Sequence, residues 1–163
     1  MNKKAVAETP QSRSHLVDYQ AKRLQEMIAE IIKCCEDRKL YENQRFGLPY
    51  AEIKCLLLFG GERYLTVKAI SQRLDVAKSR VTKLVNGLLR KGFVKRVEDP
   101  QDTRVKLISL TPAGRKKIKD VEEFHLHIHK KLVMQMNGED RTAILSNLET
   151  LRTCMEAVKE ELV

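Results

Sequence analysis

Residues 78–86 bring cations, hydroxyls and an amide together within a stretch of helical periodicity. The apolar residues of this stretch recur at helical spacing, which predicts one buried face of a helix that runs from about Ala77 to Lys91: Val81, Leu84, Val85, Leu88 and Leu89. Arginine and asparagine can pair with guanine and adenine edges in the major groove, and lysine and serine with phosphate. We therefore predict a DNA-reading helix whose contact residues are Lys78, Ser79, Arg80, Thr82, Lys83 and Asn86.

A second charged group lies between two segments rich in Val, Ile and Leu. Residues 93–98 and 104–110 predict paired strands, with a turn at Asp99-Pro100. Asp102 and Arg104 are two positions apart, so their side chains point the same way and the carboxylate can hold the guanidinium extended. A narrow minor groove attracts an extended arginine, whereas the alternative is an ordinary surface ion pair. The predicted DNA contacts of this hairpin are Asp102, Arg104 and Lys106.

The basic charge of the chain is concentrated around these two groups. The 163 residues carry a net charge of +9. Residues 77–119 hold 13 Lys and Arg against 3 Asp and Glu, a net charge of +10, which leaves 18 against 19 for the rest of the chain. Such a concentration of positive charge is typical of a phosphate-binding surface. The alternative is a solvated basic face without a partner.

Helix caps and helix breaks in the sequence predict the helices that position the residues of the DNA-reading helix and of the hairpin. Thr66 caps a helix over residues 67–74, and a break at Asp75 separates it from the DNA-reading helix. Two short helices joined in this way are typical of a helix-turn-helix. Thr111-Pro112 predicts the start of a long helix that runs to about Met136.

Long amphipathic helices are predicted at both ends of the chain. Apolar residues recur at helical spacing from Ser12 or Ser14 to about Lys39, and a linker is predicted at residues 43–49. In the last helix, residues 139–162, the apolar intervals alternate between 4 and 3, a heptad-like seam that must face another helix. Since so short a chain offers no evident partner, we predict a two-fold symmetric homodimer.

The predicted fold is mainly α, an α+β winged helix-turn-helix with long N- and C-terminal helices that form a dimerisation lobe. The predicted boundaries are a flexible tail at residues 1–11, a helical dimerisation region at 12–47 and 112–163, and a DNA-binding domain at 48–111.

The remaining reactive side chains give little indication of catalysis or of metal binding. No nucleophile–base pair, phosphate loop or paired carboxylates are evident, so we predict neither an enzyme nor a cofactor. His125 and His129 lie one helical turn apart, the spacing of a metal pair, but no cysteine spacing completes a site; solvated or interface histidines are the alternative. Cys34 and Cys35 are expected to be buried as small apolar residues.

The chain is also expected to be a cytoplasmic protein without a membrane span. Its first residues contain no long apolar run of the kind that a secretory signal has. No segment approaches the roughly 18 apolar residues that a spanning helix needs.

The order of these elements resembles the MarR family of bacterial winged-helix regulators. The hairpin of that family carries an Asp-x-Arg element and then a Leu-Thr-x-x-Gly run, which this chain matches at residues 102–104 and 110–114. The glycine after the DNA-reading helix is matched by Gly92. Two departures are Thr103, where an arginine is common, and Ala77, where a capping serine is common.

The resemblance implies a dimer on a pseudo-palindromic operator of double-stranded DNA. Regulators of this family are mostly repressors that a small ligand or oxidation releases, with the ligand between the dimer helices and the winged-helix lobe. The residues predicted to line such an effector pocket are Tyr19, Phe46 and Tyr50. The alternatives are a metal- or redox-responsive regulator of the same fold and a winged-helix module that binds proteins; the cations of residues 78–83 argue against the latter.

Overall fold

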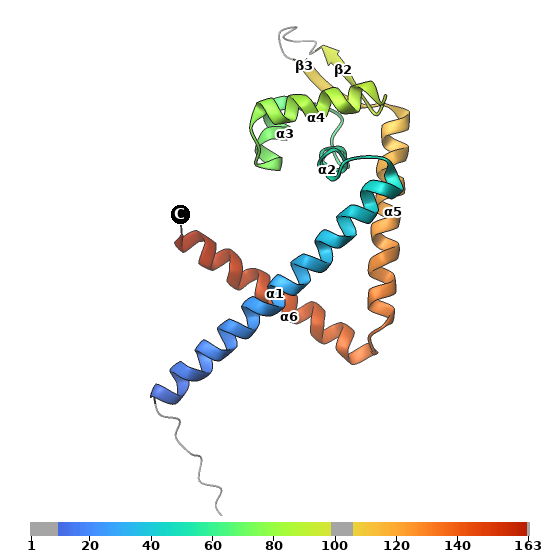
Figure 1. Cartoon of the computed structure of the whole chain (residues 1–163). Helices are drawn as coiled ribbons and strands as arrows, with labels where there is room; N and C mark the ends of the chain where they lie inside the picture. Colours follow the sequence, from blue (N-terminus) through green and yellow to red (C-terminus); the bar gives the residue numbers. More distant parts are fainter. Residues whose placement is uncertain (1–9, 99–105, 163) are drawn as a thin grey trace, which may run out of the picture. The chain divides into compact units, whose positions relative to one another are not determined.

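The computed structural model describes residues 10–98 and 106–162, and it consists mainly of helices (Figure 1). The chain divides into two compact units, residues 1–54 and 55–163. The elements, in chain order, are α1 (Pro10–Phe46), α2 (Tyr50–Leu57), β1 (Leu65–Thr66), α3 (Val67–Leu74), α4 (Lys78–Arg90), β2 (Val94–Glu98), β3 (Lys106–Leu110), α5 (Pro112–Met134) and α6 (Gly138–Glu161). This mainly α architecture with a small antiparallel sheet confirms the predicted fold class.

The first unit is dominated by α1, a continuous helix of 37 residues. The predicted end at Lys39 and the predicted linker from residue 43 were wrong, because no glycine or proline interrupts the helix before Gly47, whose φ is +62°. The predicted tail was too long, because residues 10 and 11 are already helical and proline suits a first helical position. The rest of that tail, residues 1–9, lies outside the described residues.

The second unit contains the helix-turn-helix formed by α3 and α4. The Thr66 hydroxyl accepts a hydrogen bond from the Ala69 N–H at 3.1 Å, so the predicted cap of α3 is confirmed. Asp75 ends α3 in the left-handed region, at φ 52° and ψ 51°. The Ser71 hydroxyl donates to the Val76 carbonyl at 2.6 Å and stabilises the turn that leads into α4.

A three-stranded antiparallel sheet follows in the order β1-β3-β2. The hairpin register pairs Val94 with Leu110 at its base and Glu98 with Lys106 near its tip. The strand β2 begins one residue later than predicted, and residues 104 and 105 of the second predicted strand lie outside the described residues. The edge strand β1 pairs Leu65 with Ile108. It was not predicted, because two residues carry no periodicity.

The start of α5 is anchored to the joint between α4 and β2. As predicted, Thr111 is the N-cap and accepts a hydrogen bond from the Gly114 N–H at 3.0 Å. Its hydroxyl also donates to the Gly92 carbonyl at 2.6 Å. Gly114 is buried, and a Cβ there would collide with the Phe93 carbonyl oxygen, so the close approach requires glycine.

The apolar core of the second unit lies beneath α3, α4 and the sheet. Its most deeply buried members include Ile70, Val81, Leu88 and Ile108. By contrast α6, which Asn137 caps, contains no buried residue. None of the helices in residues 10–98 and 106–162 has an apolar stretch that could span a lipid bilayer.

The cysteines differ from expectation in their exposure. Cys34 and Cys35 are exposed in the single subunit, so the expectation that they are buried was wrong for this chain by itself. Cys55 is buried, and Cys154 is exposed on α6.

Candidate nucleic-acid interface

Helix α4 separates its apolar and polar side chains onto two faces. Val81, Val85 and Leu88 are at most 2% exposed, so this side of the helix is fixed to the core. The opposite side presents all six side chains that the sequence predicted as DNA contacts, and each of them is exposed: Lys78, Ser79, Arg80, Thr82, Lys83 and Asn86. Among the described residues, no carboxylate pairs with the three cations, so α4 presents unpaired positive charge on a fixed frame.

The first turn of α4 has no side-chain cap, as the alanine at position 77 predicted. Ala77 makes no capping hydrogen bond, so the first backbone N–H groups remain available to another acceptor. Thr82 donates its hydroxyl to the Lys78 carbonyl at 2.9 Å. Its methyl group and one hydroxyl lone pair remain for contact with a ligand.

Asn86 is held by a strand of the hairpin. The Arg96 guanidinium donates from Nη2 to Asn86 Oδ1 at 2.9 Å, which links α4 to β2. Paired recognition of adenine requires both the amide oxygen and the amide N–H₂ of an asparagine. The hydrogen bond from Arg96 takes up one of the two lone pairs of the oxygen, so Asn86 keeps two N–H donors but only one acceptor position for a ligand. The donors suit guanine acceptors or phosphate oxygens. No local pattern indicates this hydrogen bond, since the two residues meet only through the fold.

The hairpin is described only up to its tip. Asp102 and Arg104 lie outside the described residues. Lys106, the third predicted contact of the hairpin, is exposed and donates to Glu98 Oε1 at 2.8 Å across the strands. This hydrogen bond, and then the charge of Lys106, lowers the pKa of Glu98 below its ordinary value of 4.5. Lys106 therefore has a partner within the chain that a phosphate would have to replace.

The predicted effector residues do not gather into one cluster within a subunit. Tyr19 is 69% exposed on α1. Phe46 ends the same continuous helix, and at 1.5 Å per residue the two positions are about 40 Å apart. Phe46 and Tyr50 are half-buried, and each ring carries a nearby cation: Arg45 at 5.9 Å from Phe46 and Lys39 at 5.3 Å from Tyr50.

The weak metal candidates lie on α5. His129 Nδ1 is 2.7 Å from the His125 carbonyl oxygen, so one ring nitrogen of His129 is engaged by its own helix. The His125 ring lies beside Phe124, with centroids 6.1 Å apart. Over the described ranges, no three His, Cys, Asp or Glu side chains come together as a metal site would need.

A helix-turn-helix whose second helix exposes cations, followed by a two-stranded hairpin, defines a winged-helix protein of the DNA-binding class. Residues 46–105 match the sequence profile of the MarR family. The chain belongs to the MarR family of winged-helix transcriptional regulators.

Individual relatives agree with this assignment. The chain is 26% identical over 121 residues to the HTH-type transcriptional regulator YfiV of Bacillus subtilis, which is 74% of this chain and 75% of that protein. It is 31% identical over 101 residues to the HTH-type transcriptional regulator SarZ of Staphylococcus saprophyticus, which is 62% of this chain and 66% of that one. The solved structure of Streptococcus pneumoniae FabT in complex with DNA is similar with a TM-score of 0.70 and 25% identity, over 85% of this chain and 99% of that chain. Both relatives are named as transcriptional regulators, and the FabT structure was solved in complex with DNA.

Proposed function

We propose that two copies of this chain bind a pseudo-palindromic DNA operator, each placing α4 in a major groove and the hairpin in the flanking minor groove. One observation carries the proposal. The apolar side of α4 is fixed in the core, while Lys78, Arg80 and Lys83 are exposed and unpaired among the described residues. The DNA-bound relative supports the same use of the fold, since its solved structure contains DNA.

A second copy is the partner that we propose for the terminal helices. In α6, Leu148, Met155 and Val158 are 50%, 53% and 55% exposed, and α1 exposes Ile31 and Ile32 to a similar degree. Apolar seams that stay exposed in a single subunit favour burial against another molecule. We accordingly propose residues 12–47 and 112–163 as the dimerisation region and 48–111 as the DNA-binding domain.

The proposed regulatory role is repression in the cytoplasm, relieved by a small-molecule effector. A dimer bound across a promoter excludes the polymerase, so repression is the direct consequence of tight operator binding. Phe46 and Tyr50, which are half-buried and close in sequence, are retained as candidate effector contacts. Tyr19 enters such a site only if a second subunit supplies it, because α1 separates it from Phe46.

The experiment that tests DNA reading is fluorescence anisotropy with a fragment of the protein's own promoter and a scrambled fragment. We expect the promoter fragment to bind about a thousandfold or more tightly than the scrambled one at physiological salt. Arg80→Ala should weaken promoter binding by about 1–3 kcal/mol, whereas Arg152→Ala on α6 should leave it unchanged. Equal affinities for both fragments at every salt concentration would refute the proposal.

The minor-groove role of the hairpin has its own test. Replacing Arg104 by alanine should weaken binding and reduce the slope of log K against log salt by roughly 0.9 for each phosphate that the variant no longer neutralises. If both the slope and the affinity of Arg104→Ala equal those of the unaltered protein, the hairpin does not contact DNA through this residue.

A further inference from the structure

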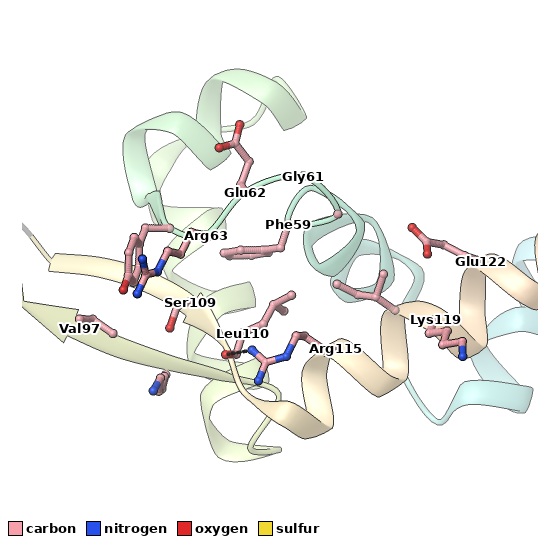
Figure 2. A pocket seen from close by; sticks show the side chains of 14 residues that line it. Phe59, Gly61, Glu62, Arg63, Val97, Ser109, Leu110, Arg115, Lys119 and Glu122 are labelled. Atoms are coloured by element: carbon pink, nitrogen blue, oxygen red, sulfur yellow. Dashed lines mark hydrogen bonds between the residues drawn. The ribbon is translucent and has the colours of Figure 1, made fainter.

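A cavity of about 690 Å³ lies on the sheet face that α4 does not cover (Figure 2). Strand alternation places the paired residues Lys95 and Ser109 on one face, and Arg96 and Ile108 on the other. Since Arg96 bonds to Asn86, α4 lies on the second face. The cavity is therefore separate from the surface proposed to read DNA.

The segment after α2 and the first half of α5 complete the cavity with an apolar wall. Phe59 and Ile118 are 3% and 6% exposed and line the cavity. Val97 and Leu110 extend this wall along the hairpin. A cavity of this volume and lining has the dimensions of a small-molecule site.

Ser109 is the polar group that marks the cavity as a binding site. Its side chain lines the cavity, yet the residue is only 6% exposed. Its hydroxyl has no hydrogen-bond partner in the described part of the chain. Buried hydroxyls are nearly always paired, because an unpaired one destabilises the fold. A ligand oxygen in the cavity would accept this hydrogen bond.

Positive charge dominates the lining. Glu62, one of its two acids, pairs with Arg73, which lies outside the lining. Arg115 donates from Nη1 to the Leu110 carbonyl at 3.2 Å, which leaves its other N–H groups available (Figure 2). No carboxylate of the described residues pairs with Lys95. The four cations of the lining are Arg63, Lys95, Arg115 and Lys119, and the second acid is Glu122. Of these cations, Lys119 pairs with Glu123, which lies outside the lining, at 3.7 Å.

We propose that this cavity binds a small organic carboxylate. The carboxylate oxygens accept hydrogen bonds from Ser109 and pair with Lys95 and Arg115, and the apolar body of the ligand covers Phe59 and Ile118. Inorganic phosphate has no hydrocarbon part, so its binding would leave the apolar wall exposed to water. This site shares no residue with the predicted DNA contacts or with the candidate effector residues, and the proposal does not rest on DNA binding.

The test is a titration of the full chain with hexanoate and phenylacetate, followed by nuclear magnetic resonance of the backbone amides. The matched probes are hexanamide and phenylacetamide, which keep the apolar body but carry no charge, and inorganic phosphate, which keeps the charge but has no apolar body. We expect at least one acid to shift the amide resonances of Lys95 and Ser109, and its amide to bind about tenfold more weakly. The proposal is overturned if neither acid binds, if acid and amide bind equally, if phosphate binds as tightly as the acids, or if the shifts lie elsewhere.

Substitution of the hydroxyl sharpens the test. Ser109→Ala should weaken binding of the acid about fivefold, the contribution of one net hydrogen bond, and Ser146→Ala on α6 is the matched control. Circular dichroism and promoter binding of Ser109→Ala verify that the variant is folded. Unchanged affinity of Ser109→Ala for the acids contradicts the proposal. Because the amide shifts are recorded without DNA, a failure of DNA binding remains distinguishable from a failure of this site.

Discussion

Helices α4 and α6 are both amphipathic in sequence, but only α4 buries its apolar side within the subunit. Val81 and Leu88 of α4 are completely buried, whereas Leu148 of α6 is 50% exposed and α6 has no buried residue. A helix that is held by its own chain can present its polar side at a fixed angle. A helix whose apolar side stays uncovered is itself the surface that a partner must cover.

The two helices therefore have different roles in the account proposed here for α4 and α6. In α4 the exposed side carries the cations, and the buried side supplies the rigidity that direct reading of base edges requires. In α6 the exposed apolar seam is the interface that we propose for the second copy. Changing each helix, or the joint that fixes α4, should therefore affect a different measurement.

The largest effect is expected at the joint that holds α4 and β2 against α5. Gly114→Ala drives a Cβ into the Phe93 carbonyl and places it 3.2 Å from Leu110 Cδ2, so the backbone must move. We expect the free energy of unfolding to fall by roughly 3 kcal/mol in a urea titration. Gly138→Ala at the start of α6 is the control, because a Cβ there meets no atom within 4 Å. Equal stabilities of the two variants would show that the joint is not a close contact.

The second effect separates assembly from folding. Leu148→Glu should raise the dissociation constant of the dimer about 100-fold, because it places an unpaired charge in the proposed apolar seam. The subunit itself should remain folded, since Leu148 is half exposed in it. Sedimentation velocity over a range of concentrations gives the assembly state, and Ser146→Glu on the opposite side of α6 is the control. If Leu148→Glu sediments like the unaltered protein, α6 is not the interface.

A smaller effect should appear in base preference rather than in affinity. Arg96→Ala removes the donor that holds Asn86 Oδ1, so the amide can turn and present both acceptor positions beside its donors. We expect the preference at one base pair of each half-site to change by about 1 kcal/mol, measured with operators that carry single substitutions. Lys83→Ala, also on α4, removes a cation that is expected to contact phosphate, so it should weaken binding to all of these operators alike. An unchanged ranking in Arg96→Ala would mean that Asn86 does not read a base.

The smallest effect concerns pH at the hairpin. Lys106 lowers the pKa of Glu98 by donating a hydrogen bond and then by its charge, so the ionised carboxylate is favoured in the folded hairpin. The stabilising contribution is present above the ordinary value of 4.5 and is lost as the pH falls through the lowered pKa. Carboxyl chemical shifts should give a midpoint for Glu98 below 4.5, and Lys106→Met should return it upward. An identical midpoint in that variant would rule out Lys106 as the cause.

Local chemistry explains which parts of the fold could be predicted from the sequence. Thr66, Thr111 and Gly92 each carry a signal that depends on a few neighbouring residues, and the helix boundaries beside them were predicted closely. The end of α1 was missed because the polar residues 43–45 resemble part of a linker, although nothing in them stops a helix before Gly47.

The unpredicted features depend on residues that meet only in the folded chain. The bond between Arg96 and Asn86, the pairing of Leu65 with Ile108, and the unpaired hydroxyl of Ser109 involve positions that no local pattern connects. The six exposed side chains of α4 were predicted, by contrast, because helical periodicity alone separates them from the apolar face.

The most direct measurement of the central claim is hydroxyl-radical footprinting of the protein on its own promoter. Two α4 helices fixed in one dimer should protect two patches whose centres are about 10 base pairs, or a multiple of one helical turn, apart. At the lowest concentration at which the unaltered protein protects both patches fully, Arg80→Ala should weaken the protection of both together. A single protected patch, or full protection of both patches by Arg80→Ala at that concentration, would contradict the reading of DNA by paired α4 helices.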